Sequence, residues 1–413
     1  MVYCCKHLVK EKFCMLKRAL MILVAACLLL SCACAEEVTI PQVKTFYQYE
    51  IPETEAMAFV KDMKIGWNLG NTFDATHDSF KGNDLDIEKA WCGVKTTEEM
   101  IDAIHKAGFN TLRLPVSWHN HVDENFIINT PWLDRVQEVA DWAIERGMYV
   151  IINIHHDNEK GYLYPTNEHY DTAEKYLTTI WQQVAERFKD YDEHLIFEAM
   201  NEPRPKGTGQ EWWFNSGDKF CQEVAVCIGK LNQAFVNTVR ASGGSNAIRY
   251  LMVPAYCASP DAATNTTWFQ LPQDTAENKL IVSAHAYTPY SFALESPGTS
   301  TFDPLKPGNL TEITRFMGNL YNTFVSKGVP VVIGEFGAVN KNNNLQDRVN
   351  FYAYYIAIAS SRNIPCVVWD NHNFGPDGEI FGLLNRRNLT FPEPILLETM
   401  MKYAGYDKMP VKE

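Results

Sequence analysis

The chain has 413 residues, of which 46% are hydrophobic, 12% aromatic and 21% charged. This balance is typical of a globular protein and excludes intrinsic disorder, a collagen-like repeat and a coiled coil. The formal net charge is −13, and because the first 35 residues contribute +4, the remaining 378 carry −17. Negative charge of this size argues against nucleic acid or another polyanion as a partner, and it favours a neutral or cationic substrate.

The first 35 residues have the features of an export signal. Lys17 and Arg18 precede a 12-residue apolar run, 19–30, which is shorter than the roughly 20 residues that a membrane span needs. The Ala-Cys-Ala of residues 33–35 matches a signal-peptide cleavage site, whereas residues 29–32 match a bacterial lipoprotein box with Cys32 as the first mature residue. Both remain open, and they predict a secreted protein or an outer-membrane or cell-surface lipoprotein.

Five cysteines follow this segment. They are Cys92, Cys221, Cys227, Cys257 and Cys366. Their number is odd, and none falls in a C-x-x-C or other metal-ligand spacing. Because a large core does not need covalent cross-links, we expect buried thiols, and whether two of them form a disulfide is left open.

Eight short apolar segments alternate with longer amphipathic stretches from residue 63 onward. Each segment is apolar throughout, as strands buried on both faces are. Eight repeats of strand and helix predict an α/β fold of the closed (β/α)8 barrel type. A doubly wound open sheet is the main alternative, but no G-x-G-x-x-G follows the first segment. The predicted strands are Lys64–Trp67, Thr111–Pro115, Tyr149–Ile154, Leu195–Met200, Tyr250–Val253, Leu280–Ala284, Val331–Gly334 and Cys366–Trp369.

The lengths of the connections predict where a site would lie. The helix-to-strand connections are short, whereas five strand-to-helix connections are long, so the long loops meet at the carboxyl-terminal ends of the strands, where barrel enzymes hold their sites. We expect a lead-in over residues 36–62 packed on the barrel, a single catalytic domain over 63–404 and a tail over 405–413. The long connections are Asn71–Lys95, Val116–Pro131, His155–Asp171, Asn201–Gly217 and His285–Asn309.

Aromatic residues are frequent in these long loops. A groove that binds a polymer needs exposed aromatic platforms, although ordinary packing of long loops would also use such residues. The candidates are Trp91, Trp118, Trp212, Trp213, Trp268, Tyr162 and Tyr164.

Two carboxylates each follow an apolar predicted strand. Glu202 comes after the fourth strand and Glu335 after the seventh, so in a barrel they would face each other across the mouth. An ion pair closing the barrel rim would explain either glutamate alone, but paired carboxylates at one site are what glycoside hydrolysis requires. The remaining polar and aromatic residues at strand ends are Arg113, His155, His156, His285, Tyr287 and Trp369.

Several motifs together resemble glycoside hydrolase family 5, the cellulase-type retaining β-glycanases. The resemblance runs in order from Met63 to Tyr403, and Phe197–Arg204 with His285–Tyr290 most resembles subfamily 4, which includes endoglucanases, mixed-linkage glucanases and xyloglucanases. The motifs are Gly66–Asn71, Arg113–Pro115, Asn153–His156, Asn201–Pro203, His285–Tyr287, Ile333–Gly337 and Trp369–Asn371.

The resemblance implies a double displacement by two glutamates. Glu202 would be the general acid/base and Glu335 the nucleophile, with their carboxyl groups about 5–5.5 Å apart. Arg113 and Tyr287 would hold Glu335 ionised, because hydrogen bonds to the charged form of a carboxyl group lower its pKa.

The resemblance also implies sugar-binding residues. Asn201 would bind the sugar 2-hydroxyl, and His155 and His285 would orient the sugar and the two glutamates. Trp369 would be a stacking platform, since a pyranose face presents C–H groups to a π surface. Further candidates for sugar contacts are Asn68, His119, His156 and Asn371.

These features predict a monomeric endo-β-1,4-glucanase that acts on cellulose, mixed-linkage glucan or xyloglucan and needs no cofactor or metal. A xyloglucan-specific enzyme and a mannanase are alternatives of the same fold. His155-His156-Asp157 could belong to a metal-dependent hydrolase, but H-E-x-x-H is absent, as is H-x-H on the first strand. A non-catalytic glycan-binding barrel would not need both glutamates. Contact with a membrane would come only through a lipid on Cys32.

Overall fold

The computed structural model describes residues 37–43, 49–79 and 85–404. The predicted leader, including Cys32, and the predicted tail lie outside the described residues. Every helix and strand that the structure describes belongs to one unit of the chain, which begins at residue 40.

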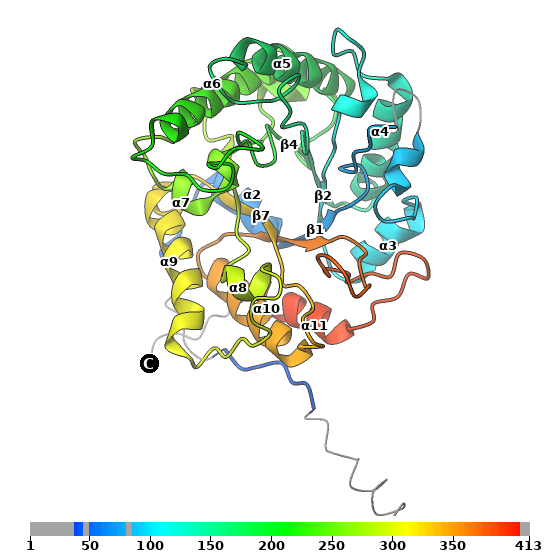
Figure 1. The fold of residues 1–413 in the computed structure, drawn as a ribbon, viewed down its shortest axis with the longest axis vertical. Coiled ribbons are helices and arrows are strands. Elements are labelled where there is room, and N and C mark those ends of the chain that lie inside the picture. Colours follow the sequence, from blue (N-terminus) through cyan, green and yellow to red (C-terminus); the bar gives the residue numbers. More distant parts are fainter. Residues whose placement is uncertain (1–36, 44–48, 80–84, 405–413) are drawn as a thin grey trace, which may run out of the picture. The chain divides into compact units, whose positions relative to one another are not determined.

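Eight parallel strands close into a barrel in the order β1 to β8, which confirms the predicted fold (Figure 1). All of their residues are buried, because the inner face packs in the barrel and the outer face packs against helices. In chain order they are β1 Ile65–Leu69, β2 Thr111–Leu114, β3 Tyr149–Asn153, β4 Leu195–Glu198, β5 Leu251–Pro254, β6 Leu280–His285, β7 Val331–Phe336 and β8 Cys366–Asp370.

Two strand ends differ from the prediction in a way that affects the site. β4 ends at Glu198, so Glu202 lies in the following loop. β7 extends to Phe336, so Glu335 is a strand residue. The pairing of β6 with β7 shifts register between Ala284 and His285, and this irregularity accompanies the extra length of β7.

A ring of helices surrounds the strands (Figure 1). Their ends carry ordinary signals: the Asp218 carboxylate accepts the N–H groups of Phe220 and Cys221 at the start of α6, and Gly328 has the left-handed φ of 81° just before β7. The helices are α2 Glu55–Asp62, α3 Glu98–Lys106, α4 Thr130–Ile144, α5 Tyr170–Arg187, α6 Lys219–Ala241, α7 Pro260–Ala263, α8 Tyr290–Ala293, α9 Pro307–Thr323, α10 Leu345–Ser360 and α11 Pro394–Tyr403.

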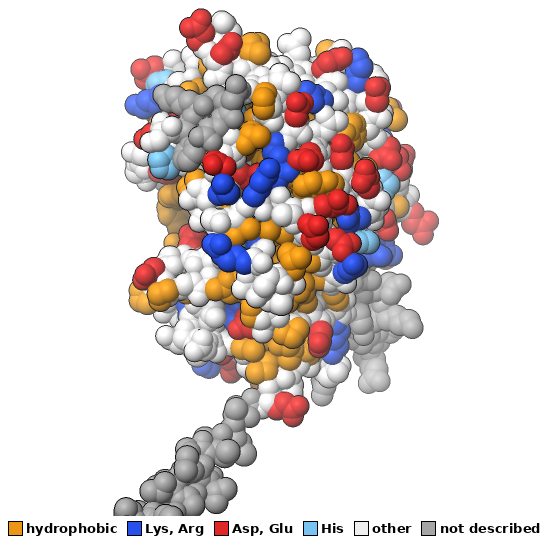
Figure 2. Space-filling view, turned by 90° about the vertical axis from the view of Figure 1, so that its right-hand side faces the viewer, with side chains coloured by type: hydrophobic (Ala, Val, Ile, Leu, Met, Phe, Trp, Pro, Cys, Tyr) orange, Lys and Arg blue, Asp and Glu red, His pale blue; other side chains and the backbone are white. Residues whose placement is uncertain are grey.

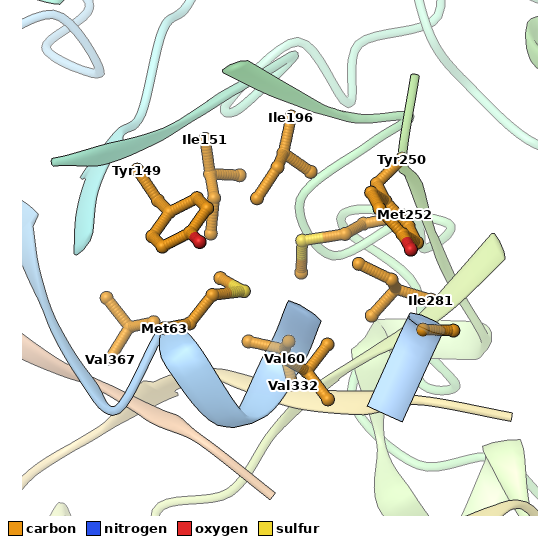
Figure 3. Packing of buried hydrophobic residues seen from close by; sticks show 11 residues of the cluster. Val60, Met63, Tyr149, Ile151, Ile196, Tyr250, Met252, Ile281, Val332 and Val367 are labelled. Carbon is orange, nitrogen blue, oxygen red and sulfur yellow. The ribbon is translucent and has the colours of Figure 1, made fainter. Parts of the chain in front are cut away.

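Helix α2 covers the amino-terminal end of the barrel. Val60 and Met63 point among side chains from the strands, including Ile196, Met252 and Ile281 (Figure 3). All of these side chains are buried, so this end of the barrel is closed by packed hydrophobic side chains. The polar residues of the strands are therefore at the opposite end, where the long loops lie.

The five cysteines Cys92, Cys221, Cys227, Cys257 and Cys366 are all free and buried. Among the described residues, no helix has the length and hydropathy needed to cross a membrane. On the side of α3 and α4, acidic and basic side chains are interspersed with apolar ones (Figure 2).

Candidate active site

Glu335 is held through both carboxylate oxygens. Oε1 accepts a hydrogen bond from Arg113 Nη1 at 2.8 Å, and Oε2 accepts one from the Tyr287 hydroxyl at 3.0 Å. Burial and the nearby Glu335 carboxylate raise the pKa of Tyr287 well above its ordinary value, so its hydroxyl keeps its proton and donates. The side chain of Glu335 is only 7% exposed, and these two donors fix its direction.

Arg113 is the centre of this polar cluster and is fully buried. Its Nη1 also donates to Asn68 Oδ1 at 2.9 Å, and its Nη2 donates to Asn201 Oδ1 at 2.7 Å. Its Nε donates to Glu198 Oε2 at 2.8 Å. One guanidinium group on β2 therefore orients residues from β1, β4 with its loop, and β7.

Glu198 belongs to this polar cluster and was not predicted individually from the sequence. It is fully buried, and it accepts hydrogen bonds from Arg113, Asn153 and Ser283. Burial alone would raise the pKa of Glu198, but the Arg113 charge, His285 and the Ser283 hydroxyl together outweigh burial and lower it to about 2. The available signal was a carboxylate inside an otherwise apolar segment, Leu195–Met200, because such a charge needs a buried partner.

His285 connects the two predicted catalytic glutamates. Its Nδ1 lies 2.9 Å from Glu202 Oε1 and 3.6 Å from Glu335 Oε1, and its Nε2 lies 3.9 Å from Glu198. Burial alone would lower the pKa of this imidazole. The three surrounding carboxylates outweigh burial and raise the pKa of His285 to about 9. Near neutral pH His285 is therefore a cation that donates to Glu202.

Glu202 lies in the loop after β4 and is less enclosed, with 16% of its side chain exposed. Burial tends to raise its pKa, but His285, the Arg204 guanidinium 3.5 Å away and His156 together outweigh burial, so the pKa of Glu202 is lowered. One oxygen of Glu202 and one of Glu335 lie within 4.8 Å of each other. This separation suits retaining chemistry, since inverting enzymes keep their carboxyl groups about 6.5–9.5 Å apart.

Two of the remaining predicted residues form a stacked pair under the site. The ring of His155 stacks on Trp369 at 5.9 Å and 10°, and burial lowers the pKa of His155 well below its ordinary value. Trp369 is 7% exposed, so only part of its surface is open to a sugar. Asn201 Oδ1 is held by Arg113, which orients the amide so that Nδ2 is the group a sugar hydroxyl would meet.

His119 and His156 line a cavity of about 640 Å³ together with Trp91. Burial would lower the pKa of His119, but Asp157 outweighs burial and raises it. Burial and the charge of Arg204 lower the pKa of His156 to about 4. The two rings therefore differ, because Asp157 favours the protonated form of His119 and the surroundings of His156 favour its neutral form.

Asn68 and Asn371 use their amides within the protein. Asn68 is fully buried, and its Nδ2 donates to the carbonyl groups of Gly334 and Val367 while its Oδ1 accepts from Arg113. Asn371 Nδ2 donates to the Glu379 carbonyl at 2.8 Å. These contacts suit residues that brace the site and its loop.

A second and larger cavity, of about 1200 Å³, is lined by Glu202, His285 and Tyr287. Trp212 and Trp213 also line it, and they are 53% and 75% exposed. Of the other rim aromatics, Trp91 is 44% exposed, whereas Trp118 and Tyr164 are buried. Arg204 lines the smaller cavity and Glu202 the larger one, so both cavities reach the loop that follows β4.

Two clusters in the described part of the chain place three ligand-type atoms within 4.8 Å of one another. In Asp74, His155 and His156, both Asp74 oxygens already accept backbone N–H groups, from Asn71 and Thr72. In the cluster of Glu202, His285 and Glu335, His285 Nδ1 lies 2.9 Å from Glu202 Oε1 and 3.6 Å from Glu335 Oε1, so contacts within the protein already link the three groups.

Known proteins resemble this chain in sequence and in fold. The family model described as cellulase, glycosyl hydrolase family 5, matches residues 71–375. Endoglucanase 1 of Ruminococcus albus is 44% identical over 376 residues, which cover 90% of this chain and 87% of that protein. Endoglucanase B of Neocallimastix patriciarum is 43% identical over 84% of this chain and 71% of its own.

Two solved structures extend the comparison. A family 5 lichenase from a Caldicellulosiruptor species, in complex with cellotetraose, has a TM-score of 0.87 and 52% identity, covering 89% of this chain and 100% of that one. A GH5-4 broad-specificity endoglucanase from Ruminococcus champanellensis, with bound cellotriose, has a TM-score of 0.79 and 46% identity, covering 86% of this chain and 100% of that one.

Proposed function

This chain belongs to glycoside hydrolase family 5, subfamily 4, and is a retaining endo-β-glucanase, and we propose that Glu335 is its nucleophile and Glu202 its general acid/base. The observation that carries this assignment is the unequal treatment of the two carboxylates. Glu335 receives a donor on each oxygen from Arg113 and Tyr287, whereas Glu202 shares a hydrogen bond with an imidazole that itself titrates.

In the first step Glu335 attacks the anomeric carbon. A bond forms between that carbon and a Glu335 oxygen while the bond to the leaving oxygen breaks, and Glu202 delivers to that oxygen the proton that it shares with His285. Arg113 and Tyr287 aim the attacking carboxylate. Asn201, held by Arg113, offers its amide to the 2-hydroxyl, a contact that strengthens in the transition state.

In the second step water replaces the glutamate. Glu202 removes a proton from the water, the oxygen attacks the anomeric carbon, and Glu335 leaves as a carboxylate, so configuration is retained. Glu202 and His285 are 2.9 Å apart and share one proton between them, so that the pair rather than Glu202 alone sets the pH range of activity.

For substrate choice, we propose linear and mixed-linkage β-glucan, with xyloglucan also accepted. The relatives are endoglucanases, a lichenase and broad-specificity endoglucanases. The cavity of about 1200 Å³ beside Glu202 offers space for branches along a glucan backbone. A mannanase or a non-catalytic glycan-binding barrel would be favoured only if β-glucans were not cleaved.

The test of function is a comparison of initial rates of reducing-end release on xyloglucan, barley β-glucan and carboxymethyl-cellulose, with Glu202→Gln as the blank. Cleavage of all three would support the proposal. Cleavage of the linear chains alone would restrict it to an endoglucanase with a narrow groove. No cleavage of any of the three would contradict it, and mannan and xylan would be tested next.

For localisation, we propose export through the leader at residues 1–35, with a monomeric catalytic domain over 63–404 preceded by the lead-in of 36–62. The support is the basic and apolar pattern of residues 17–30. Mass spectrometry of the exported protein separates the two cleavage models, because a secreted form begins at Glu36 and a lipoprotein begins at a lipidated Cys32. Size-exclusion chromatography tests the monomer.

A further inference from the structure

Arg204 contacts three groups around the loop that follows β4. Its Nη1 donates to the Glu202 carbonyl at 2.8 Å and lies 3.5 Å from Glu202 Oε2. Its Nε donates to Glu211 Oε1 at 3.2 Å. Its guanidinium carbon lies 4.0 Å from the ring centroid of Trp212. The side chain is only 8% exposed, so these contacts are shielded from water.

Trp212 has one face on this guanidinium and remains 53% exposed. It lines the cavity of about 1200 Å³ together with Glu202. Because a general acid must reach the leaving oxygen, the leaving part of the glucan lies in the cavity that Glu202 lines. A sugar ring in that cavity can stack on the exposed part of Trp212, so Arg204 lies between the acid and a platform for the leaving chain.

The turn after β5 fixes the loop that carries these residues. The Cys257 N–H donates to the Pro203 carbonyl at 3.1 Å, and its thiol donates to the Glu211 carbonyl at 3.0 Å. The φ of Cys257 is 53°, a left-handed conformation that is rare for residues other than glycine and is held here by the surrounding contacts. With its backbone anchored, this loop presents Arg204 and Glu211 in a defined arrangement.

We propose that Arg204 is a positioning residue that supports the proton transfer from Glu202 and is itself held in place by Trp212. This proposal rests on the assignment of Glu202 as the acid/base. As the leaving sugar takes its proton, Glu202 becomes a carboxylate, and the guanidinium 3.5 Å away stabilises the charge that forms. A sugar stacked on Trp212 excludes water from the guanidinium and strengthens this effect.

Other titratable groups also lie around Glu202 and Arg204, and those that are charged act on the same proton. They are His285 from β6, Glu335 from β7, His156 after β3, Glu211 on the same loop, Cys257 after β5, Tyr287 after β6 and Glu379 after β8. Arg204 differs from these groups in that it also contacts the exposed platform.

The test compares kcat/KM for a cello-oligosaccharide with kcat/KM for 2,4-dinitrophenyl β-cellobioside, whose leaving group needs no proton. In Arg204→Met we expect kcat/KM to fall about threefold to tenfold on the oligosaccharide and less than about twofold on the dinitrophenyl glycoside.

The pH profile of kcat/KM on the oligosaccharide gives a second readout. In Arg204→Met its alkaline limb moves upward by about half a pH unit, because losing a cation favours protonated Glu202. Arg204→Lys keeps the charge, so it restores most of the rate on the oligosaccharide and most of the position of the alkaline limb. Equal losses on both substrates with an unmoved limb would overturn the proposal.

Trp212 and its neighbour Trp213 provide a matched pair of variants, since both line the same cavity and only Trp212 is assigned to Arg204. Trp212→Ala should move the alkaline limb in the same direction as Arg204→Met, and combining the two should add little. Trp213→Ala should raise KM without moving the limb. Equal limb shifts in the two tryptophan variants, or full additivity of Arg204→Met with Trp212→Ala, would remove Trp212 from the proposal.

Glu202→Gln in the same assay separates this proposal from the assignment on which it rests. If Glu202→Gln loses equally on both substrates, Glu202 is not the acid and the proposed function fails. If Glu202→Gln lowers kcat/KM on the oligosaccharide but not on the dinitrophenyl glycoside, and Arg204→Met does not show this pattern, then only the proposal for Arg204 is wrong.

Discussion

Glu335 and Glu202 lie within one site, yet the protein holds them in different ways. Glu335 is on a barrel strand, and direct donors on both oxygens come from Arg113 and Tyr287. Glu202 is on a loop, with His285 as its hydrogen-bond partner and Arg204 nearby. A nucleophile has to stay charged and aimed, whereas an acid/base has to lose and regain a proton. Rigid donors suit the first task, and a titrating partner suits the second.

Removing the nucleophile should have the largest effect. Glu335→Ala should lower the initial rate on barley β-glucan by at least about 10³-fold, because no covalent intermediate forms. With added azide, Glu335→Ala should give the α-glycosyl azide and Glu202→Ala the β-glycosyl azide, since azide then replaces a different partner in each. The opposite assignment of products would reverse the two roles.

Removing the rigid donor on the nucleophile side should be the next largest change. Arg113→Met leaves Glu198 and Glu335 without their buried cation, so we expect about 3–5 kcal/mol less stability and at least about 100-fold lower kcat. Urea unfolding and initial rates measure the two losses. Arg135→Met is the control: it breaks the buried pair with Glu88, away from the site, and should destabilise the protein without a comparable fall in kcat.

Removing the second donor tests how finely Glu335 must be aimed. Tyr287→Phe deletes one hydrogen bond to Oε2, and we expect kcat/KM to fall about tenfold. Tyr355→Phe is the matched control, because its hydroxyl donates to a buried backbone carbonyl, that of Ala286, instead of a catalytic group. Similar rate losses in both variants would mean that packing, not the hydrogen bond to Glu335, explains the effect.

The smallest change in kcat/KM is expected from a change of pH, because Glu202 and His285 share a proton. The pKa of His285 is raised to about 9, so this imidazole stays protonated until the pH rises through that value. Between pH 6 and 8, kcat/KM should therefore change by less than about threefold. If Glu202 titrated alone with an ordinary carboxyl pKa, the rate would fall about 100-fold over those two units.

The sequence predicted the barrel because each strand is a short apolar run and each long loop follows a strand. It also located Glu202 and Glu335 by their places after such runs. The side-chain directions could not be read in this way. Asn68 points into the barrel wall, where it holds Arg113, and Glu198 is the buried partner of the same guanidinium. These directions depend on strand register and tilt, which join residues far apart in the chain.

The buried free thiols have a practical consequence. Cys221 and Cys227 on α6 and Cys366 on β8 are at most 1% exposed, so a thiol reagent reaches them only when the structure opens. Their reaction rates would report on the opening of two separate parts of the barrel without any introduced label. Because all five described thiols are free, a reducing buffer would not change the covalent structure of the described residues during such a measurement.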